Sequence, residues 1–127
     1  NSKDICLSIF KINFKNGFMN FAYNQKDIAK FYNLYFDLMK YWKKLFPDQI
    51  YTINYENLIK NSEVEIKKLI NFCDLEWDEK CLKHDKNKSV IKTASIFQAR
   101  KPIYNSSINL SDNYSEYLRE MFKLVEN

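Results

Sequence analysis

Residues 25–46 read QKDIAKFYNLYFDLMKYWKKLF, and after a Pro-Asp pair residues 49–55 read QIYTINY. In the first stretch, apolar side chains recur at the three- and four-residue spacing that places them on one face of a helix. Asn24 is a suitable N-cap and Pro47 cannot continue a helix, so we predict a helix over residues 25–46. We expect its aromatic face, which includes Trp42, to lie in the core, with ligand stacking as the less favoured alternative.

The shorter stretch has the composition of a strand. It is rich in β-branched and aromatic residues, and Tyr51, Ile53 and Tyr55 alternate with other positions. We therefore predict a strand over residues 49–55, with a helix before it and helices after it, as in half of a layered α/β domain. One strand cannot form a sheet, so it must pair with strands from elsewhere, and an exposed edge would favour a homodimer.

Apolar periodicity and capping residues predict five further helical segments, over residues 2–14, 62–73, 78–82, 95–100 and 112–126. Ser2 is the expected N-cap of the first segment, and Gly17 is expected to close it in a left-handed conformation. Ser62 begins a capping box, and Ser111 precedes the last segment as its cap. The expected fold class is therefore α/β, mostly helical with one strand.

The composition excludes several classes of protein. The chain has 127 residues, enough for one domain, and a single glycine, so it contains no glycine-rich phosphate loop. Lysine and arginine number 20 against 16 acidic residues, a net charge of +4, and only Arg100 and Arg119 are arginines. Dedicated DNA-binding proteins are usually more basic and richer in arginine, so we expect no nucleic-acid partner. Weak binding of single strands through lysines and tyrosines ranks last among the functions considered.

Cysteine usage and hydropathy favour the cytoplasm. Cys6, Cys73 and Cys81 are far apart and form no CxxC pair, which disfavours a zinc site and a disulfide framework. We expect reduced core thiols in a cytoplasmic protein. No apolar stretch is long enough for a membrane helix, so no membrane partner is expected. His84 is the only histidine, and because no ligand set or catalytic partner accompanies it, we expect a solvated surface residue and no metal.

Residues 93–108, TASIFQARKPIYNSSI, combine hydroxyl side chains with two basic residues and a rigid proline turn. Free N–H groups at a helix start, a capping Ser95 and the nearby Lys101 would make an anion site. A capped surface turn with ordinary charges would use the same residues. The residue types alone favour neither interpretation.

Four motifs in this chain resemble those of one family: DICLSIF at 4–10, YENLI at 55–59, LEW at 75–77 and TASIFQARKPIY at 93–104. They are similar to the C-terminal half of sulfotransferases that use 3′-phosphoadenosine-5′-phosphosulfate (PAPS), closest to bacterial sulfotransferase-domain proteins and tyrosylprotein sulfotransferases. The resemblance implies the C-terminal portion of a P-loop-like α/β fold. It also implies transfer of a sulfuryl group from PAPS to the hydroxyl of a tyrosine or a small alcohol, leaving 3′-phosphoadenosine-5′-phosphate (PAP).

The resemblance also implies which residues contact the nucleotide. Ser8 matches a serine that contacts the 3′-phosphate, and Tyr55 matches a tyrosine at the end of a strand. The family's loop that wraps the nucleotide is matched by Ser95, Gln98, Lys101 and Pro102. A nucleotide with two phosphate groups requires hydroxyl, backbone and ammonium donors of the kind that these positions supply.

Departures from the family predict an inactive fragment. The family's 3′-phosphate arginine, its phosphosulfate loop and its catalytic base correspond to positions ahead of Asn1, and a basic residue followed by Trp is replaced by Leu110 and Ser111. We therefore expect one partial sulfotransferase domain over residues 1–127 with no catalytic residue of its own. Losing several charge-assisted contacts would leave PAP binding in roughly the millimolar range. The alternative is a non-catalytic helical interaction module.

Overall fold

The computed structural model describes residues 1–14, 17–87, 89 and 101–125, and every regular element in these ranges is helical. The α-helices are α1 (Ser2–Lys11), α2 (Gln25–Leu45), α3 (Tyr55–Lys60), α4 (Ser62–Phe72) and α6 (Arg119–Leu124). The 3₁₀ helices are η1 (Gly17–Tyr23), η2 (Glu79–Lys86) and η3 (Leu110–Tyr114). No helix in these ranges combines the length and the hydropathy that crossing a membrane requires.

The predicted α/β class is wrong, because no strand occurs in the described part of the chain. Residues 50–54 form neither a helix nor a strand, and Tyr55 begins α3. Asn54 caps this helix, since its side-chain oxygen accepts a hydrogen bond from Asn57 N at 3.0 Å. A β-branched segment becomes a strand only when a neighbour pairs with its backbone, and no described segment does so. The predicted homodimer through an exposed strand edge loses its basis with the strand.

Contacts between residues divide the chain into two compact units. Unit 1 comprises Asn1–Ile50 and Ser106–Asn127 and contains α1, η1, α2, η3 and α6. Unit 2 comprises Tyr51–Asn105 and contains α3, α4 and η2. The two units differ in how far they bury their apolar side chains.

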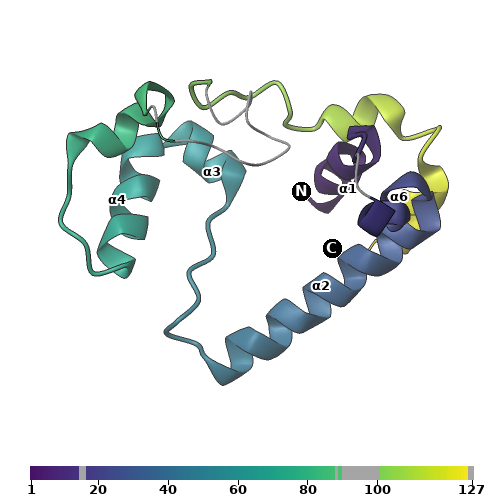
Figure 1. Cartoon of the computed structure of the whole chain (residues 1–127), viewed down its shortest axis with the longest axis horizontal. Helices are drawn as coiled ribbons and strands as arrows, with labels where there is room; N and C mark the ends of the chain where they lie inside the picture. The colour runs from purple at the N-terminus through teal and green to yellow at the C-terminus, as the bar shows by residue number, and fades with distance from the viewer. Residues whose placement is uncertain (15–16, 88, 90–100, 126–127) are drawn as a thin grey trace. The chain divides into compact units, whose positions relative to one another are not determined.

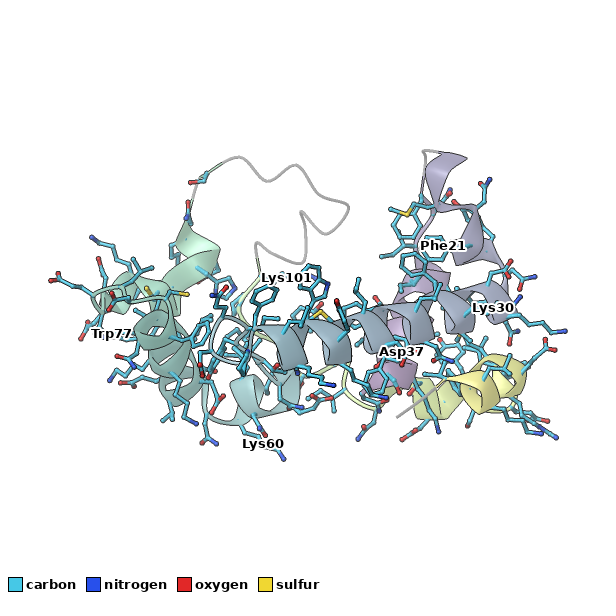
Figure 2. The ribbon with its side chains drawn as sticks, turned by 90° about the horizontal axis from the view of Figure 1, so that it is seen from below. Phe21, Lys30, Asp37, Lys60, Trp77 and Lys101 are labelled. Atoms are coloured by element: carbon cyan, nitrogen blue, oxygen red, sulfur yellow. The ribbon has the colours of Figure 1, made fainter. Side chains whose placement is uncertain are left out.

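Unit 1 has a compact core at the N-terminal end of α2. Helices α1 and α6 lie against this end of α2 (Figure 1). On its other side, Phe21 of η1 stacks on Phe31 of α2 with ring centroids 4.1 Å apart (Figure 2). Burying one aliphatic side chain contributes about 1.5–3 kcal/mol, so the buried cluster is the main source of stability in unit 1. Its members are Cys6, Leu7, Ile28, Ala29, Leu118, Met121 and Val125.

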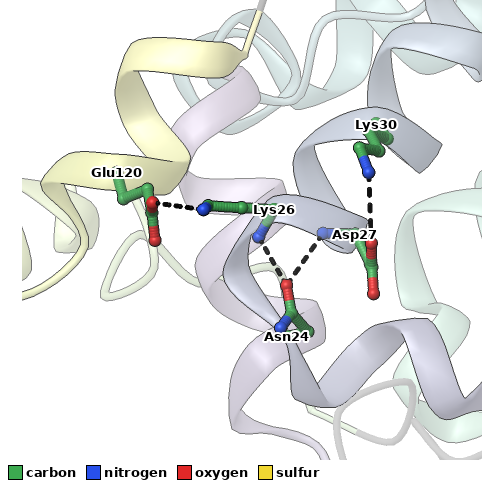
Figure 3. Close-up of polar contacts among 5 residues, drawn as sticks. All are labelled: Asn24, Lys26, Asp27, Lys30 and Glu120. Atoms are coloured by element: carbon green, nitrogen blue, oxygen red, sulfur yellow. Dashed lines mark hydrogen bonds and ion pairs between the residues drawn. The ribbon is translucent and has the colours of Figure 1, made fainter.

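Polar contacts define the start of α2 and link it to α6. Asn24 Oδ1 accepts hydrogen bonds from Lys26 N at 2.9 Å and from Asp27 N at 3.2 Å, which confirms the predicted N-cap (Figure 3). Lys26 Nζ lies 3.0 Å from Glu120 Oε1 of α6, and both side chains are exposed (Figure 3). An exposed ion pair of this kind contributes about 1 kcal/mol or less. The apolar core, rather than this pair, therefore holds α6 in place.

Asp4 connects α1 to η3. Its carboxylate oxygens accept hydrogen bonds from Asn109 N and Ser111 N, each at 2.8 Å. Asn109 has a left-handed backbone with φ 55°, a conformation that asparagine tolerates better than most residues. Ser111 is fully buried and no side-chain cap was found for η3, so its predicted role as a helix cap is wrong.

Several predicted boundaries at the N-terminal end are displaced. Asn1, not Ser2, caps α1, with its side chain accepting a hydrogen bond from Lys3 N at 3.0 Å. The helix ends at Lys11 and does not reach residue 14. Ile12, with an extended backbone, is the C-cap of α1, so Gly17 at the start of η1 is not the left-handed cap that we expected.

Later segments also depart from the expected boundaries. Ser62 lies inside the first turn of α4, and its hydroxyl donates to Leu58 O at 2.8 Å, while Asn61 holds the cap position. Residues 112–126 do not form one helix, because η3 and α6 are separated by a turn. The helix predicted over residues 95–100 lies outside the described residues.

The aromatic face of α2 is core only at its first turns. Ile28 and Ala29 are fully buried, whereas Trp42 is 40% exposed. The helix continues past α1 and α6 (Figure 1), so its C-terminal half has no packing partner among these helices. The exposed apolar side chains along it are Phe31, Leu34, Tyr35, Leu38, Tyr41, Trp42 and Leu45, and they form the apolar stripe of α2. The expectation that the whole face lies in the core is wrong for this stripe.

Unit 2 is built from short helices around α4. Tyr51 packs on Phe72 with ring centroids 5.1 Å apart, and Lys67 Nζ lies 5.0 Å from the centroid of the Trp77 ring. No described residue of unit 2 is fully buried. Cys6 is buried, Cys73 is exposed and Cys81 is half-buried. The prediction that the cysteines are core thiols is therefore confirmed for Cys6 only.

Candidate functional site

A cavity of about 670 Å³ lies within unit 2. Helices α3, α4 and η2 form its walls together with residues 101–104. Most of the described lining is apolar, and Lys101 is the one lysine among these residues. The lining residues are Tyr55, Leu58, Ile66, Leu69, Ile70, Cys81, His84, Lys101, Pro102, Ile103 and Tyr104.

The apolar wall of the cavity follows from the sequence of α4. Ile66, Leu69 and Ile70 are three and four positions apart, so they lie on one face of the helix. Lys67 and Lys68 on the flanks pair with Glu63 and Glu65 at 2.5 Å and 2.7 Å. The charged side chains of α4 are thereby paired with one another, and its apolar face lines the cavity.

Residues 101–104 are held to the walls by hydrogen bonds at both ends. Tyr55 Oη of α3 donates to Tyr104 O at 2.9 Å. His84 Nε2 of η2 lies 3.0 Å from Lys101 O. Because a carbonyl oxygen can only accept, the His84 contact requires the proton on Nε2. Two side chains from different helices therefore anchor a four-residue segment by its main chain.

The Tyr55 hydroxyl uses its proton in the hydrogen bond to Tyr104 O. Partial burial, and then the nearby Tyr104 phenol, raise the pKa of Tyr55 above its ordinary value. The phenol is neutral at physiological pH and is a permanent donor. Its ring, rather than its hydroxyl proton, is what Tyr55 can offer to a ligand in the cavity.

Lys101 supplies the positive charge of the cavity. It is exposed and forms no ion pair with any described residue. Pro102 follows it, and the residue before a proline is restricted to extended backbone conformations. An unpaired ammonium on a restricted backbone beside apolar walls suits a ligand with an aromatic part and an anionic part.

The structure brings together three of the six residues predicted to contact the nucleotide. Tyr55, Lys101 and Pro102 line the same cavity, although Tyr55 is far from the other two in the sequence. Ser8 lies on α1 in unit 1, where it is exposed. Ser95 and Gln98 lie outside the described residues. The nucleotide contacts of all six residues stay predictions.

Sequence reasoning missed His84, Tyr104 and Cys81 as lining residues. His84 is exposed, as expected, but it also bonds to the main chain of Lys101. The sequence predicted a helix over residues 78–82, whereas η2 continues to Lys86 across a kink at Lys83. A contact between residues 84 and 101 depends on how the chain folds back, and no local pattern indicates it.

A second cavity of about 490 Å³ shares Cys81 and His84 with the first. Its other lining residues are Asp78, Lys80, Lys83, Lys86 and Asn87. Lys80 pairs with Asp78 and Lys86 pairs with Asp85, each at 3.4 Å. In the ranges that the structure covers, no group of three or more His, Cys, Asp or Glu side chains is arranged to hold a metal ion.

Comparisons with known proteins identify related sequences. The sequence model of a family described as the sulfotransferase family matches residues 3–79, which is more than half of the chain. A protein of Aquifex aeolicus (strain VF5), described only as uncharacterized, is 38% identical over 128 residues. That alignment covers 99% of this chain but 17% of the relative, so the chain spans about a sixth of the relative's length. No solved structure matches the chain.

Proposed function

The chain belongs to the sulfotransferase family, and from this premise we propose that it forms the nucleotide side of a PAPS-dependent sulfotransferase. The observation that carries the proposal is the unit 2 cavity, where Tyr55, Lys101 and Pro102 meet. Tyr55 lies inside the region matched by the family, and the other two residues lie beyond it. The proposal therefore joins a family motif to a loop that the family comparison does not cover.

The chemistry of the cavity suits a purine nucleotide. Its aliphatic walls and the rings of Tyr55 and Tyr104 offer apolar surface to an adenine ring. The Lys101 ammonium complements a phosphate group, and one charge-assisted hydrogen bond contributes about 1.5–3 kcal/mol. We assign the adenosine end of PAPS or PAP to this cavity, and the nucleotide contacts predicted for Ser8, Ser95 and Gln98 rest on the resemblance alone.

We propose that the chain binds the nucleotide but does not transfer the sulfuryl group alone. In-line transfer depends on positioned donors and on a general base, and we assign no residue of this chain to that role. The relative, six times longer than the region it shares with this chain, is consistent with a larger enzyme. The proposed acceptor is the hydroxyl of a tyrosine or a small alcohol.

We propose a cytoplasmic location on the basis of the cysteines. Cys6, Cys73 and Cys81 are all free of disulfide bonds. Exposed free thiols such as that of Cys73 are typical of a reducing compartment. Labelling the thiols of the protein isolated from cells would test this, since a disulfide at Cys73 would contradict it.

A titration of the chain with PAP, followed by two-dimensional NMR of the backbone amides, tests the nucleotide site. Lys101→Ala should weaken binding by about 10- to 150-fold, the value of one charge-assisted contact, without unfolding the chain. Lys60→Ala removes another exposed lysine of unit 2, outside the cavity, and should leave the affinity unchanged. No response to PAP at several times the expected dissociation constant, or equal losses in the two variants, would overturn the proposal.

A non-catalytic helical interaction module is the second candidate. The observation that favours it is the apolar stripe of α2, which stands exposed in this chain. Such a module would bind a protein partner through the stripe and would be indifferent to PAP. The same PAP titration therefore separates the two candidates.

A further inference from the structure

Two hydrogen bonds fix the backbone position of Lys101. The main chain of residues 101–104 is anchored at Lys101 O by His84 and at Tyr104 O by Tyr55, at 3.0 Å and 2.9 Å. Pro102 between these anchors has a fixed φ and restricts the backbone of Lys101. The segment has few free torsions left, so the anchors set the position of the lysine Cα relative to the cavity walls.

We propose that His84 is a positioning residue for the nucleotide, a role that rests on the function proposed above. Its imidazole does not need to touch the ligand. It holds Lys101 O through Nε2–H, and the ammonium of Lys101 then reaches the anionic part of a nucleotide seated between the apolar walls. Without this anchor, the lysine end of the segment would be tied only through Tyr55 at its far end.

Helix η2, which carries His84, is itself held in place. The side chain of Asp78 caps η2, accepting a hydrogen bond from Lys80 N at 2.8 Å. Helix η2 is kinked at Lys83, and Cys81 before the kink and His84 after it both line the cavity. Helix η2 also contacts α4, which carries the apolar wall. The imidazole thus projects from an element that is part of the cavity, not from a free loop.

The tautomer of His84 is a test that needs no ligand. The chain has one histidine, so a long-range ¹H–¹⁵N spectrum of the imidazole contains a single, unambiguous set of signals. At a pH where the ring is neutral, we expect the proton on Nε2. A ring protonated on Nδ1 alone would leave Nε2 facing a carbonyl oxygen without a hydrogen, and would overturn the proposal.

Two substitutions separate positioning from simple packing. His84→Leu removes the donor at similar volume, and His84→Gln keeps an amide N–H donor. We expect His84→Leu to weaken PAP binding about fivefold, the value of one neutral hydrogen bond, and His84→Gln to restore most of the affinity. In a Lys101→Ala background, His84→Leu should cause no further loss, because the positioned group is already absent.

The outcomes distinguish this inference from the nucleotide site itself. If PAP binds and Lys101→Ala weakens it while His84→Leu does not, the positioning role is overturned and the nucleotide site stands. Equal losses in His84→Leu and His84→Gln would also overturn the role. If the unmodified chain does not respond to PAP, the proposed function fails, and this inference fails with it.

Discussion

Unit 1 contains every fully buried side chain in the described part of the chain, and unit 2 contains none. In unit 1, apolar side chains from α1, α2 and α6 fill the space between the helices. In unit 2, the apolar face of α4 lines a cavity of about 670 Å³. Apolar periodicity therefore specifies the apolar face of a helix but not what packs on it, because the same pattern lines a filled core in one unit and a cavity in the other.

The difference places the main source of stability in unit 1 and supports the proposal that unit 2 binds a ligand. A side chain that already has close neighbours contributes through packing, whereas one beside a cavity leaves room for a ligand. Four experiments test whether the two units differ in this way.

Ile28→Ala should have the largest effect on stability. Ile28 is fully buried, and removing such a side chain from a packed core costs about 2–5 kcal/mol. The matched control is Ile66→Ala, because Ile66 is half-buried at the cavity and should cost about 1 kcal/mol. Urea unfolding followed by circular dichroism measures both free energies. Equal losses would show that unit 2 is packed as firmly as unit 1.

The cysteines should differ about 100-fold in reactivity between the units. Burial raises the pKa of the Cys6 thiol to about 11, while Cys73 is exposed. Iodoacetamide reacts with thiolates, so at pH 8 we expect Cys73 to be alkylated about 100-fold faster than Cys6. Mass spectrometry of the labelled peptides measures both rates, and PAP should slow the reaction of Cys81. Comparable rates at Cys6 and Cys73 in the folded chain would contradict the packed core of unit 1.

Asp4→Asn should destabilise unit 1 by about 1–2 kcal/mol. The carboxylate accepts two backbone N–H groups at 2.8 Å, and an asparagine has one oxygen to replace its two. Asp37→Asn is the control, because Asp37 makes only an exposed contact with Lys40 at 3.9 Å (both are on α2). Thermal unfolding of the two variants measures the difference. Identical midpoints would show that the contact between α1 and η3 contributes nothing.

Trp42→Ala should have the smallest effect, about 1 kcal/mol or less. Trp42 is 40% exposed, and its ring stacks on Phe46 with centroids 5.6 Å apart. A core tryptophan would instead cost about 3–5 kcal/mol, as the aromatic periodicity of α2 first suggested. Urea unfolding decides between the two values. The larger loss would mean that the apolar stripe is covered when the chain is in solution.

Local patterns predicted most of the helices. Asn24 and Pro47 bracket a run with helical periodicity, and α2 spans Gln25–Leu45, within one residue of the predicted end. Periodicity is read from neighbouring residues, so it locates most helices, whereas the predicted caps Ser2, Ser62 and Ser111 were wrong. The predicted strand was wrong because a strand depends on a distant partner. Residues 49–55 have the right residue types, but a strand exists only where another segment pairs with it.

Some features of the candidate site were predicted from the sequence, and others depend on the fold. Tyr55 and Lys101 were found through motifs, which are visible without coordinates. That they line one cavity could not be predicted, because it depends on the fold of the segments between them. No motif includes His84, and the proposal of a positioning role depends on its 3.0 Å contact with Lys101 O.

The order of residues determined the family and the main helices, and it supplied the candidate nucleotide contacts, because these follow from residue type and short-range spacing. The tertiary structure decided which apolar faces meet and which line a cavity, and where the one histidine makes its hydrogen bond. These outcomes depend on contacts between residues far apart in the chain, and local patterns carry no information about such contacts.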